Sequence, residues 1–215
     1  MKINTSDYGN IWFTSDWHIG HKRDFIWEPR GAKSRDDYVK QHILGINKLA
    51  RPDDLIIHMG DVALTASTGE IGSWFNEIEC KNFWSIKGNH DNNYLRFLDT
   101  KPKGNYRNLG PFLEITLIEP SLFKGDKARR TAVTLCHFPL QIWNKSHHGA
   151  WHLCGHSHNS FEESNWAFPE YKRFDCGVEA ALEFDQKHMF SFNDVKAIMS
   201  TKCIYYGDHH NKETT

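Results

Sequence analysis

The stretch at residues 11–21 reads Ile-Trp-Phe-Thr-Ser-Asp-Trp-His-Ile-Gly-His. Its first four residues, Ile11 to Thr14, are aromatic or β-branched, which predicts a short buried strand. A carboxylate and two imidazoles, from Asp16, His18 and His21, follow that strand directly. Ligands of open α/β sheets bind beyond the carboxyl ends of the strands. The stretch therefore predicts an α/β protein whose functional site begins where this strand ends.

Five more short apolar runs are strand candidates, at residues 55–59, 83–86, 112–118, 131–136 and 151–154. Apolar residues at helical spacing predict helices at 36–50 and 71–78, each preceded by a capping-box pattern, Ser34-x-x-Asp37 and Ser67-x-x-Glu70. This alternation predicts parallel pairing of the first three strands. The strand-rich half after residue 100 adds strands to the same core or forms a second packed sheet, and a last helix is expected at 191–202.

Composition limits the possible classes. The 215 residues carry 26 Lys and Arg against 27 Asp and Glu, so charge does not indicate a dedicated nucleic-acid or membrane-surface binder. No apolar run reaches the roughly 18 residues of a membrane-spanning helix. The first residues lack the apolar segment of a secretory signal, and no Cys-x-x-Cys pair occurs, so we expect a cytoplasmic protein with reduced thiols. The length predicts one domain, residues 1–206, and a disordered polar tail, residues 207–215.

Metal-binding side chains follow four further strand candidates as well as the first. These groups are Gly60-Asp61, Gly88-Asn89-His90-Asp91, His137 and Gly155-His156-Ser157-His158. Each group alone has an ordinary explanation as a turn, a helix cap or a structural histidine. Those explanations do not account for the occurrence of all five groups, in order, at five strand ends. Oxygen and imidazole ligands suit Mn, Fe, Co or Zn, and the lack of a thiolate argues against structural zinc.

Seven candidate ligands exceed the coordination number of one ion. They are Asp16, His18, Asp61, Asn89, His137, His156 and His158. Two ions that share one bridging carboxylate would use all seven, and paired ions about 3.5 to 4 Å apart catalyse the hydrolysis of phosphate esters. We therefore expect two divalent metal ions, with manganese favoured and Fe, Co, Ni or Zn as alternatives.

The order Asp-x-His, Gly-Asp, Gly-Asn-His-Asp, His and Gly-His-x-His resembles the calcineurin-like metallophosphoesterase superfamily over nearly the whole chain. The resemblance implies a four-layer α/β/β/α sandwich, with the dimetal site at one edge of two sheets. It also implies that His90 is the catalytic histidine beside the leaving group and that Asp91 orients His90. The implied ligands are Asp16, His18 and His158 for one metal, Asn89, His137 and His156 for the other, and Asp61 as the bridge.

Within the superfamily the chain is similar to small bacterial and phage-type phosphoesterases, on residues 15–21 and on Gly-Asp-Val-Ala at 60–63. It departs from the Ser/Thr protein phosphatases, which continue the second motif as Gly-Asp-x-x-Asp-Arg-Gly and the third as Gly-Asn-His-Glu. It is also too short to carry the capping domain of the related DNA-repair nucleases. The expected activity is hydrolysis of a nucleotide-like or other small phosphodiester by a metal-bridging hydroxide, with His90 assisting the leaving group.

Three alternatives stay open. The first is a nuclease on single-stranded nucleic acid, for which Lys124, Lys127, Arg129 and Arg130 offer a local basic patch. The second is a phosphomonoesterase. The third, a non-catalytic binding scaffold, is disfavoured because every ligand position is filled. No membrane partner is expected, and a homodimer through the strand-rich half is possible.

Two further residues are candidate substrate contacts. His21 could bind the substrate phosphate or hydrogen-bond a metal ligand, and a structural role is the alternative. Arg30 could pair with a phosphate, although a solvated loop arginine is the more common case. Residues 175–179 look like the closing strand of the superfamily, and their Glu179 receives no predicted role.

Overall fold

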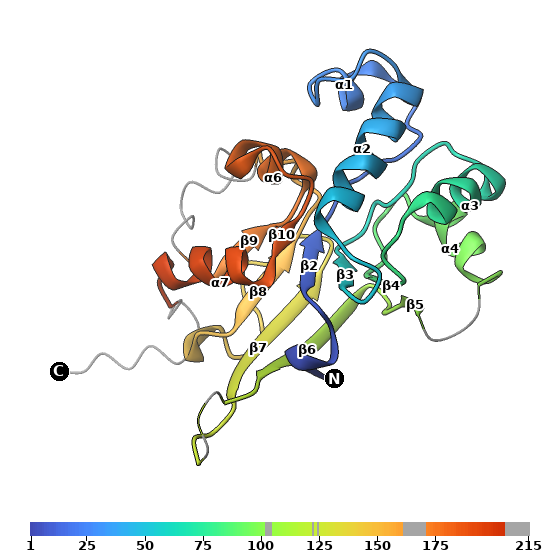
Figure 1. Ribbon diagram of the computed structural model, residues 1–215. Coiled ribbons are helices and arrows are strands. Elements are labelled where there is room, and N and C mark those ends of the chain that lie inside the picture. The colour runs from blue at the N-terminus through green and yellow to red at the C-terminus, as the bar shows by residue number, and fades with distance from the viewer. Residues whose placement is uncertain (102–104, 122, 124, 161–170, 205–215) are drawn as a thin grey trace.

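Two five-stranded sheets packed face to face form the core of the computed structural model (Figure 1). The structure describes residues 1–101, 105–121, 123, 125–160 and 171–204. The sheet orders are β10-β2-β3-β4-β5 and β1-β6-β7-β8-β9. The strands are β1 (Lys2–Asn4), β2 (Ile11–Thr14), β3 (Leu55–His58), β4 (Asn82–Ser85), β5 (Tyr106–Asn108), β6 (Phe112–Glu119), β7 (Arg129–Cys136), β8 (Trp151–Cys154), β9 (Arg173–Asp175) and β10 (Phe190–Ser191). The expected α/β class and the second packed sheet are confirmed.

Strands β2, β3 and β4 pair in parallel, with Ile11 opposite Leu55 and Leu55 opposite Asn82. Strand β7 is parallel to β8 and antiparallel to β6. Because parallel strands run in the same direction, their carboxyl ends reach the same edge of a sheet. The residues that follow β2, β3 and β4 are thereby brought together, as the parallel pairing predicted from the sequence requires.

The predicted crossover helices are present as α2 (Arg35–Leu49) and α3 (Thr68–Glu77). Ser67 and Glu70 form the complete capping box of α3. Ser34 caps α2 by accepting a hydrogen bond from the backbone N–H of Asp37. The carboxylate of Asp37, however, accepts from the backbone N–H of Lys33, so the box at α2 is not closed. The Asp37 carboxylate thus bonds to the residue before the cap and not to Ser34 itself, and the helix still begins within one residue of its expected start.

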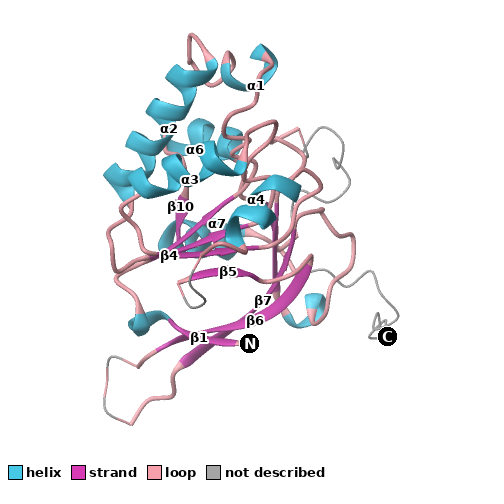
Figure 2. Ribbon diagram, turned by 90° about the vertical axis from the view of Figure 1, so that its right-hand side faces the viewer, coloured by secondary structure: helices cyan, strands magenta, loops and turns pink. Residues whose placement is uncertain are grey.

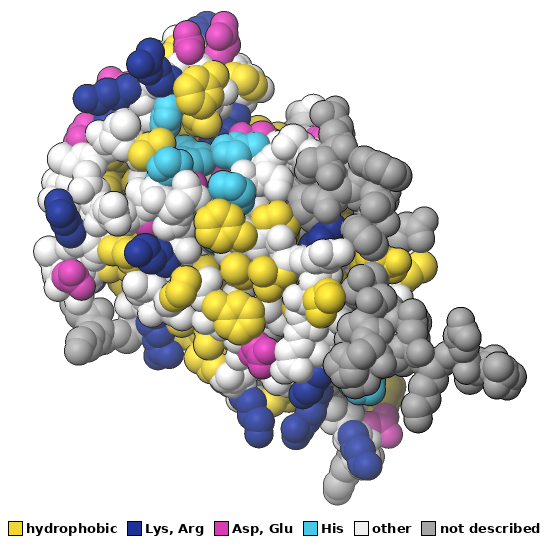
Figure 3. Space-filling view, turned by 180° about the vertical axis from the view of Figure 1, so that it is seen from behind, with side chains coloured by type: hydrophobic (Ala, Val, Ile, Leu, Met, Phe, Trp, Pro, Cys, Tyr) yellow, Lys and Arg dark blue, Asp and Glu magenta, His cyan; other side chains and the backbone are white. Residues whose placement is uncertain are grey.

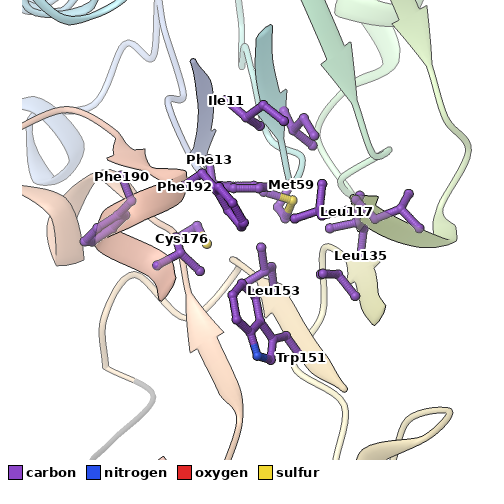
Figure 4. Close-up of a cluster of buried hydrophobic side chains, with 14 of the residues drawn as sticks. Ile11, Phe13, Met59, Leu117, Leu135, Trp151, Leu153, Cys176, Phe190 and Phe192 are labelled. Atoms are coloured by element: carbon purple, nitrogen blue, oxygen red, sulfur yellow. The ribbon is translucent and has the colours of Figure 1, made fainter. Parts of the chain in front are cut away.

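The side chains of the first sheet alternate between two apolar layers, as strands require. Ile11 and Phe13 face the second sheet and join a core that includes Leu135 and Leu153 (Figure 4). Trp12 faces the other way, toward α2, α3 and α4 (Asn92–Leu98). Figure 2 shows α2 and α3 on one side of β4, with β1 and β6 on the other. The helical layer therefore holds the outer face of the sheet that carries the first three motifs.

Two further helices lie beside strands β9 and β10 (Figure 1). They are α6 (Val178–Asp185) and α7 (Phe192–Thr201), and α7 contributes Phe192, Val195 and Met199 to the core between the sheets. Residues 176–179 are not part of the closing strand, because β9 ends at Asp175 and Glu179 lies in the first turn of α6. This part of the sequence-based expectation was wrong.

Short elements and loops complete the described chain. They include helix α1 (Asp24–Trp27) and the 3₁₀ turns η1 (Thr5–Asp7) and η2 (Ser146–His148). The loop that holds η2 covers the outer face of the second sheet, where the backbone N–H of Leu140 donates to Nε2 of His152 over 2.9 Å. No helix in the described residues is both long and apolar enough to cross a membrane. The expected polar tail, residues 207–215, lies outside the described residues.

Candidate metal centre

The five sequence motifs meet in loops at the carboxyl ends of β2, β3, β4, β7 and β8. Backbone hydrogen bonds tie these loops to one another: Asp16 N–H donates to the Gly60 carbonyl over 3.0 Å, and His18 N–H donates to that of Asp61 over 3.0 Å. Gly155 N–H donates to the His137 carbonyl over 2.9 Å within the second sheet, and His156 N–H joins that sheet to this frame by donating to Oδ2 of Asp16 over 2.8 Å. Figure 3 shows histidine side chains gathered in one area of the surface, with hydrophobic side chains beside them.

Five of the predicted ligands have a left-handed backbone. Their φ values are 56° at Asp16, 46° at His18, 60° at Asp61, 72° at His156 and 48° at His158. Residues other than glycine rarely adopt this conformation, which costs on the order of 1 kcal/mol or more for each. Such strain persists only where the surrounding structure holds it, and it is concentrated at functional sites. In the first and last motifs this turn directs two side chains, Asp16 with His18 and His156 with His158, toward one region.

One set of ligand atoms comes from Asp16, His18 and His158, and it lies within 4.8 Å. The Nε2 atoms of His18 and His158 are 3.1 Å apart, and they lie 3.8 Å and 3.9 Å from Oδ1 of Asp16. This Oδ1 is buried and accepts no hydrogen bond from the described residues. An unpaired buried carboxylate oxygen facing two imidazole nitrogens fits a divalent cation, since burial of such an oxygen without a partner is costly.

A second set joins Asp16 to Asp61 and His137. Oδ2 of Asp61 lies 3.4 Å from Nε2 of His137 and 3.8 Å from Nε2 of His18, so this oxygen is between the two sets. Oδ1 of Asn89 lies 3.0 Å from Nε2 of His137. The ring of His156 lies beside this set, with its centroid 5.1 Å from that of His137. The structure thus brings all seven predicted ligands to one place, which could hold two ions.

Burial and neighbouring charges set the protonation states. Burial lowers the pKa of His18 to about 3, so this imidazole is neutral at neutral pH. Burial raises the pKa of Asp61, but the hydrogen bond with His137 and the charge of His137 outweigh it and bring the value to about 2. Asp61 is therefore anionic. Neutral imidazole and ionised carboxylate are the forms that bind metal ions.

Asp91 has partners other than the one the sequence indicated. Its carboxylate is buried and accepts hydrogen bonds from the backbone N–H groups of Asp61 (2.9 Å), Val62 (2.8 Å) and Gly88 (2.7 Å). These three bonds tie the second motif to the third. The structure therefore assigns Asp91 to holding the Asp61 loop in place, whereas the expectation was that it orients His90.

His90 and His21 lie next to the first ligand set. The His90 side chain is exposed, its ring centroid is 5.7 Å from that of His18, and its backbone N–H donates to Oδ1 of Asp61 over 2.8 Å. His21 is buried, and its Nδ1 accepts from the backbone N–H of Arg23 over 3.0 Å. His90 therefore lies exposed beside this ligand set, while Nδ1 of His21 is hydrogen-bonded within its own loop.

Arg30 is buried, so it is not the solvated loop arginine considered as the alternative. Its guanidinium donates to the carbonyls of Asp16 and Trp17, each over 2.8 Å. It also donates to the hydroxyl of Tyr38 and to Oε1 of Glu179. These acceptors all belong to the protein, so the structure places Arg30 behind the ligand loop.

Glu179 is a residue that sequence reasoning missed. Its Oε1 lies 3.0 Å from Nδ1 of His158, and burial of the carboxylate is outweighed by His158 and Arg30, which lower its pKa to about 2. A carboxylate at Nδ1 fixes that nitrogen as the donor and leaves Nε2 free to bind a metal. In the sequence Glu179 stands four residues after Asp175 of β9, and no local pattern there connects it to His158.

Comparisons with known proteins identify the family and the fold of the chain. The Gene 66 protein of Mycobacterium phage L5 is 29% identical over 153 residues, which cover 67% of this chain and 71% of that protein. The crystal structure of a protein of unknown function from Aquifex aeolicus matches with a TM-score of 0.57 and 16% identity, over 88% of this chain and 98% of that one, and this likeness concerns the fold alone. The family described as calcineurin-like phosphoesterase matches residues 9–176. That match spans most of the chain, and the protein belongs to the calcineurin-like phosphoesterase family.

Proposed function

We propose that the protein is a phosphodiesterase that uses two divalent metal ions, with manganese favoured, on a nucleotide-like or other small diester. Family membership indicates a phosphoester hydrolase. The observation that carries the proposal is the pair of ligand sets that share Asp16, each with its donor atoms within 4.8 Å. The unpaired Oδ1 of Asp16 and the neutral Nε2 of His18 fit a metal ion. We assign Asp16, His18 and His158 to one ion and Asn89, His137 and His156 to the other. Asp61 is assigned to both, because its Oδ2 lies 3.4 Å from Nε2 of His137 and 3.8 Å from Nε2 of His18.

Bound divalent ions at such a site activate a water molecule and neutralise the charge on phosphoryl oxygens. The residues of the chain supply the rest. Asp61 fixes the spacing of the ligand sets through its contacts with His18 and His137. It also holds the backbone of His90, which stands exposed beside His18. His90 can donate a hydrogen bond or a proton to the departing oxygen, which is typically worth about 10² to 10⁴ in rate.

The position of Arg30 favours a diester over a monoester. A phosphomonoester carries a second negative charge near neutral pH, and arginine often binds phosphate groups through two hydrogen bonds. Here the guanidinium of Arg30 donates to Glu179, Tyr38 and two backbone carbonyls. Arg30 therefore offers no contact to the second negative charge of a monoester, which favours a diester with its single charge as the substrate.

A screen on one metal-free preparation tests the proposal. The protein is reconstituted with Mn, Fe, Co, Ni or Zn and assayed on an aryl phosphodiester, an aryl phosphomonoester, cyclic nucleotides and short oligonucleotides. We expect metal-dependent turnover of the diester, with a higher kcat/KM than for the monoester. A preference for the monoester would instead make the protein a phosphomonoesterase. No turnover with any ion would support the scaffold.

The basic patch gives limited support to the nuclease alternative. Arg129 and Arg130 begin β7, and His137 follows the other end of that strand. Eight residues of strand span about 25 Å at a rise of about 3.3 Å each, so these cations do not adjoin the ligand sets. Lys124 lies outside the described residues. The nuclease alternative predicts that turnover of single-stranded DNA falls steeply as the salt concentration rises, while turnover of a small diester does not depend on salt. That result would favour the nuclease over the small-diester phosphodiesterase.

Gly88 provides a steric test of the ligand frame. A Cβ atom at this position would lie 2.2 Å from Oδ1 and 2.3 Å from the backbone N of Asp61, which no real contact allows. We expect Gly88→Ala to displace Asp61, to weaken metal binding at least 10-fold and to destabilise the fold by about 1–3 kcal/mol. Titration calorimetry with Mn and urea unfolding in chelator measure the two effects.

Gly69 in helix α3 is the matched control, because the nearest atom to its added Cβ is 4.0 Å away. Gly69→Ala should keep the affinity for Mn and, as an alanine in a helix, should not lower stability. Wild-type affinity for Mn in Gly88→Ala would contradict the placement of Asp61 in the site.

Glu179→Ala tests whether the carboxylate behind His158 supports metal binding. Loss of such a partner typically costs about 10- to 100-fold in metal affinity. We expect one of the two ions to bind more weakly by this factor, since His158 belongs to only one ligand set. Mn titration followed by elemental analysis measures the loss per site.

Two companion variants sharpen that result. Glu179→Gln keeps an oxygen that can accept from Nδ1 of His158, so it should retain more affinity than Glu179→Ala. Asp185→Ala removes an exposed carboxylate from the same helix and should leave both ions bound. Equal weakening of both ions by Glu179→Ala would indicate a general disruption of the fold.

A further inference from the structure

Two exposed phenylalanine rings lie near the ligand sets, one against His137 and His156 and the other against His21. Phe138 is 45% exposed, and its ring centroid lies 4.7 Å from that of His156 and 5.0 Å from that of His137. Phe25 is 65% exposed, and its ring centroid lies 5.1 Å from that of His21. Large apolar side chains exposed next to a catalytic site are typical of ligand contacts. In Figure 3, hydrophobic side chains lie on both sides of the histidine cluster.

The two rings flank different parts of the site. Phe138 follows His137 directly and contacts the histidines assigned to the second ion. Phe25 is reached from the first ligand set through His21, whose ring centroid is 6.2 Å from that of His18. A phosphodiester carries one substituent on each side of its phosphorus. The two phenylalanines therefore match the two substituents of a diester held between the ligand sets.

The rings are also open to stacking. Phe138 crosses the plane of His156 at 64°, and Phe25 crosses that of His21 at 65°, so neither ring lies flat on its histidine. An exposed aromatic face binds a planar base, and base stacking on an aromatic side chain is worth about 1–3 kcal/mol. Such stacking tolerates every base, because every base has a π-face.

We propose that Phe138 and Phe25 are stacking platforms for nucleobases, so that the substrate is a nucleotide diester with a base on at least one side of the scissile phosphate. This inference rests on the proposed phosphodiesterase function. It names the substrate class of that site and assigns specificity to two residues outside the metal motifs. An acyl-chain phosphodiester is the competing class, and the test separates the two.

The test measures binding and turnover separately. Binding of a nucleoside monophosphate and of inorganic phosphate to the Mn-loaded protein is measured by titration calorimetry. Phe138→Ala should weaken binding of the nucleotide about 5- to 100-fold, the range that corresponds to base stacking, and should leave phosphate binding unchanged. Phe25→Ala should raise KM for a dinucleotide diester by a similar factor. For glycerophosphoethanolamine, a diester without an aromatic group, KM should rise far less in either variant than KM for the dinucleotide diester.

Two controls keep the result interpretable. Phe123→Ala removes a ring that is 72% exposed in the turn between β6 and β7, and it should change none of these constants. Phe138→Leu keeps apolar bulk without an aromatic face and should bind the nucleotide as weakly as Phe138→Ala. Full recovery in Phe138→Leu would overturn the nucleobase in favour of an aliphatic group.

The outcomes also distinguish this inference from the function beneath it. Diester turnover together with unchanged nucleotide affinity in Phe138→Ala would overturn the stacking role and leave the phosphodiesterase standing. Absent turnover of every diester, with phenylalanine-dependent binding of the nucleotide, would refute the phosphodiesterase and retain the binding site. Both variants replace exposed side chains, so circular dichroism should show the wild-type fold.

Discussion

The Asp61→Asn variant is expected to lose both metal binding and phosphodiester turnover, with kcat reduced by at least about 10³-fold. Oδ2 of Asp61 is the oxygen between the two ligand sets, 3.4 Å from His137 and 3.8 Å from His18. Asparagine keeps the size of the side chain and an acceptor for the backbone N–H of His90, but it removes the negative charge. Loss of metal-assisted charge stabilisation is worth several kcal/mol, and each 1.36 kcal/mol is a factor of ten in rate.

The measurements are Mn titration by calorimetry and steady-state turnover of the aryl diester. Asp53→Asn is the matched control, because Asp53 is exposed and precedes β3 at the end opposite to Asp61. It should bind Mn and turn over substrate as the wild type does. Tight binding of two Mn ions by Asp61→Asn would refute the assignment of Asp61 to both ions.

The position of Asp61 could be predicted from the sequence because local rules determine it. A buried run, Leu55 to His58, predicts a strand, and parallel pairing puts its carboxyl end beside those of β2 and β4. The same rules placed Asp16 and Asn89 at that edge. Strand periodicity and parallel pairing together account for the core and for the ligand loops.

Other parts of the site depend on contacts between distant segments. Arg30 and Glu179 are 149 residues apart, and their pairing requires that helix α6 begin directly after β9. The residues from Glu179 to Glu183 read Glu-Ala-Ala-Leu-Glu, which favours the helix that the structure shows. The hydrogen bond from Val178 N–H to the Ser15 carbonyl, over 3.2 Å, fixes where this helix begins. The helix could therefore be expected locally, whereas the contact of Glu179 with Arg30 depends on a distant segment.

Asp91 illustrates the same limit in the third motif. The family resemblance implied that its carboxylate orients the neighbouring His90. The folded chain instead offers it three backbone donors from two motifs, at Asp61, Val62 and Gly88. Unpaired backbone N–H groups in a buried loop are costly, so satisfying them determines where the carboxylate points. The hydrogen-bond needs of a neighbouring loop are not visible in a local motif.

The His90→Ala variant is expected to bind two metal ions as the wild type does while kcat for the diester falls about 10²- to 10⁴-fold. The contact of His90 with the ligand frame is made by its backbone N–H, which donates to Oδ1 of Asp61 and is kept by alanine. Its imidazole is exposed, so its removal leaves no cavity in the core. The loss should therefore fall on the chemical step, and calorimetry with Mn beside steady-state kinetics separates the two effects.

A change of leaving group makes the role of His90 more specific. A side chain that assists the departing oxygen matters most when that oxygen is basic, so His90→Ala should lose far more turnover on an alkyl-type diester than on an aryl diester with an acidic phenol. His148→Ala removes another exposed imidazole, in η2, and should lose none on either substrate. Equal losses on the two diesters would show that His90 binds the phosphate group. Loss of a metal ion would show that the imidazole supports the ligand frame.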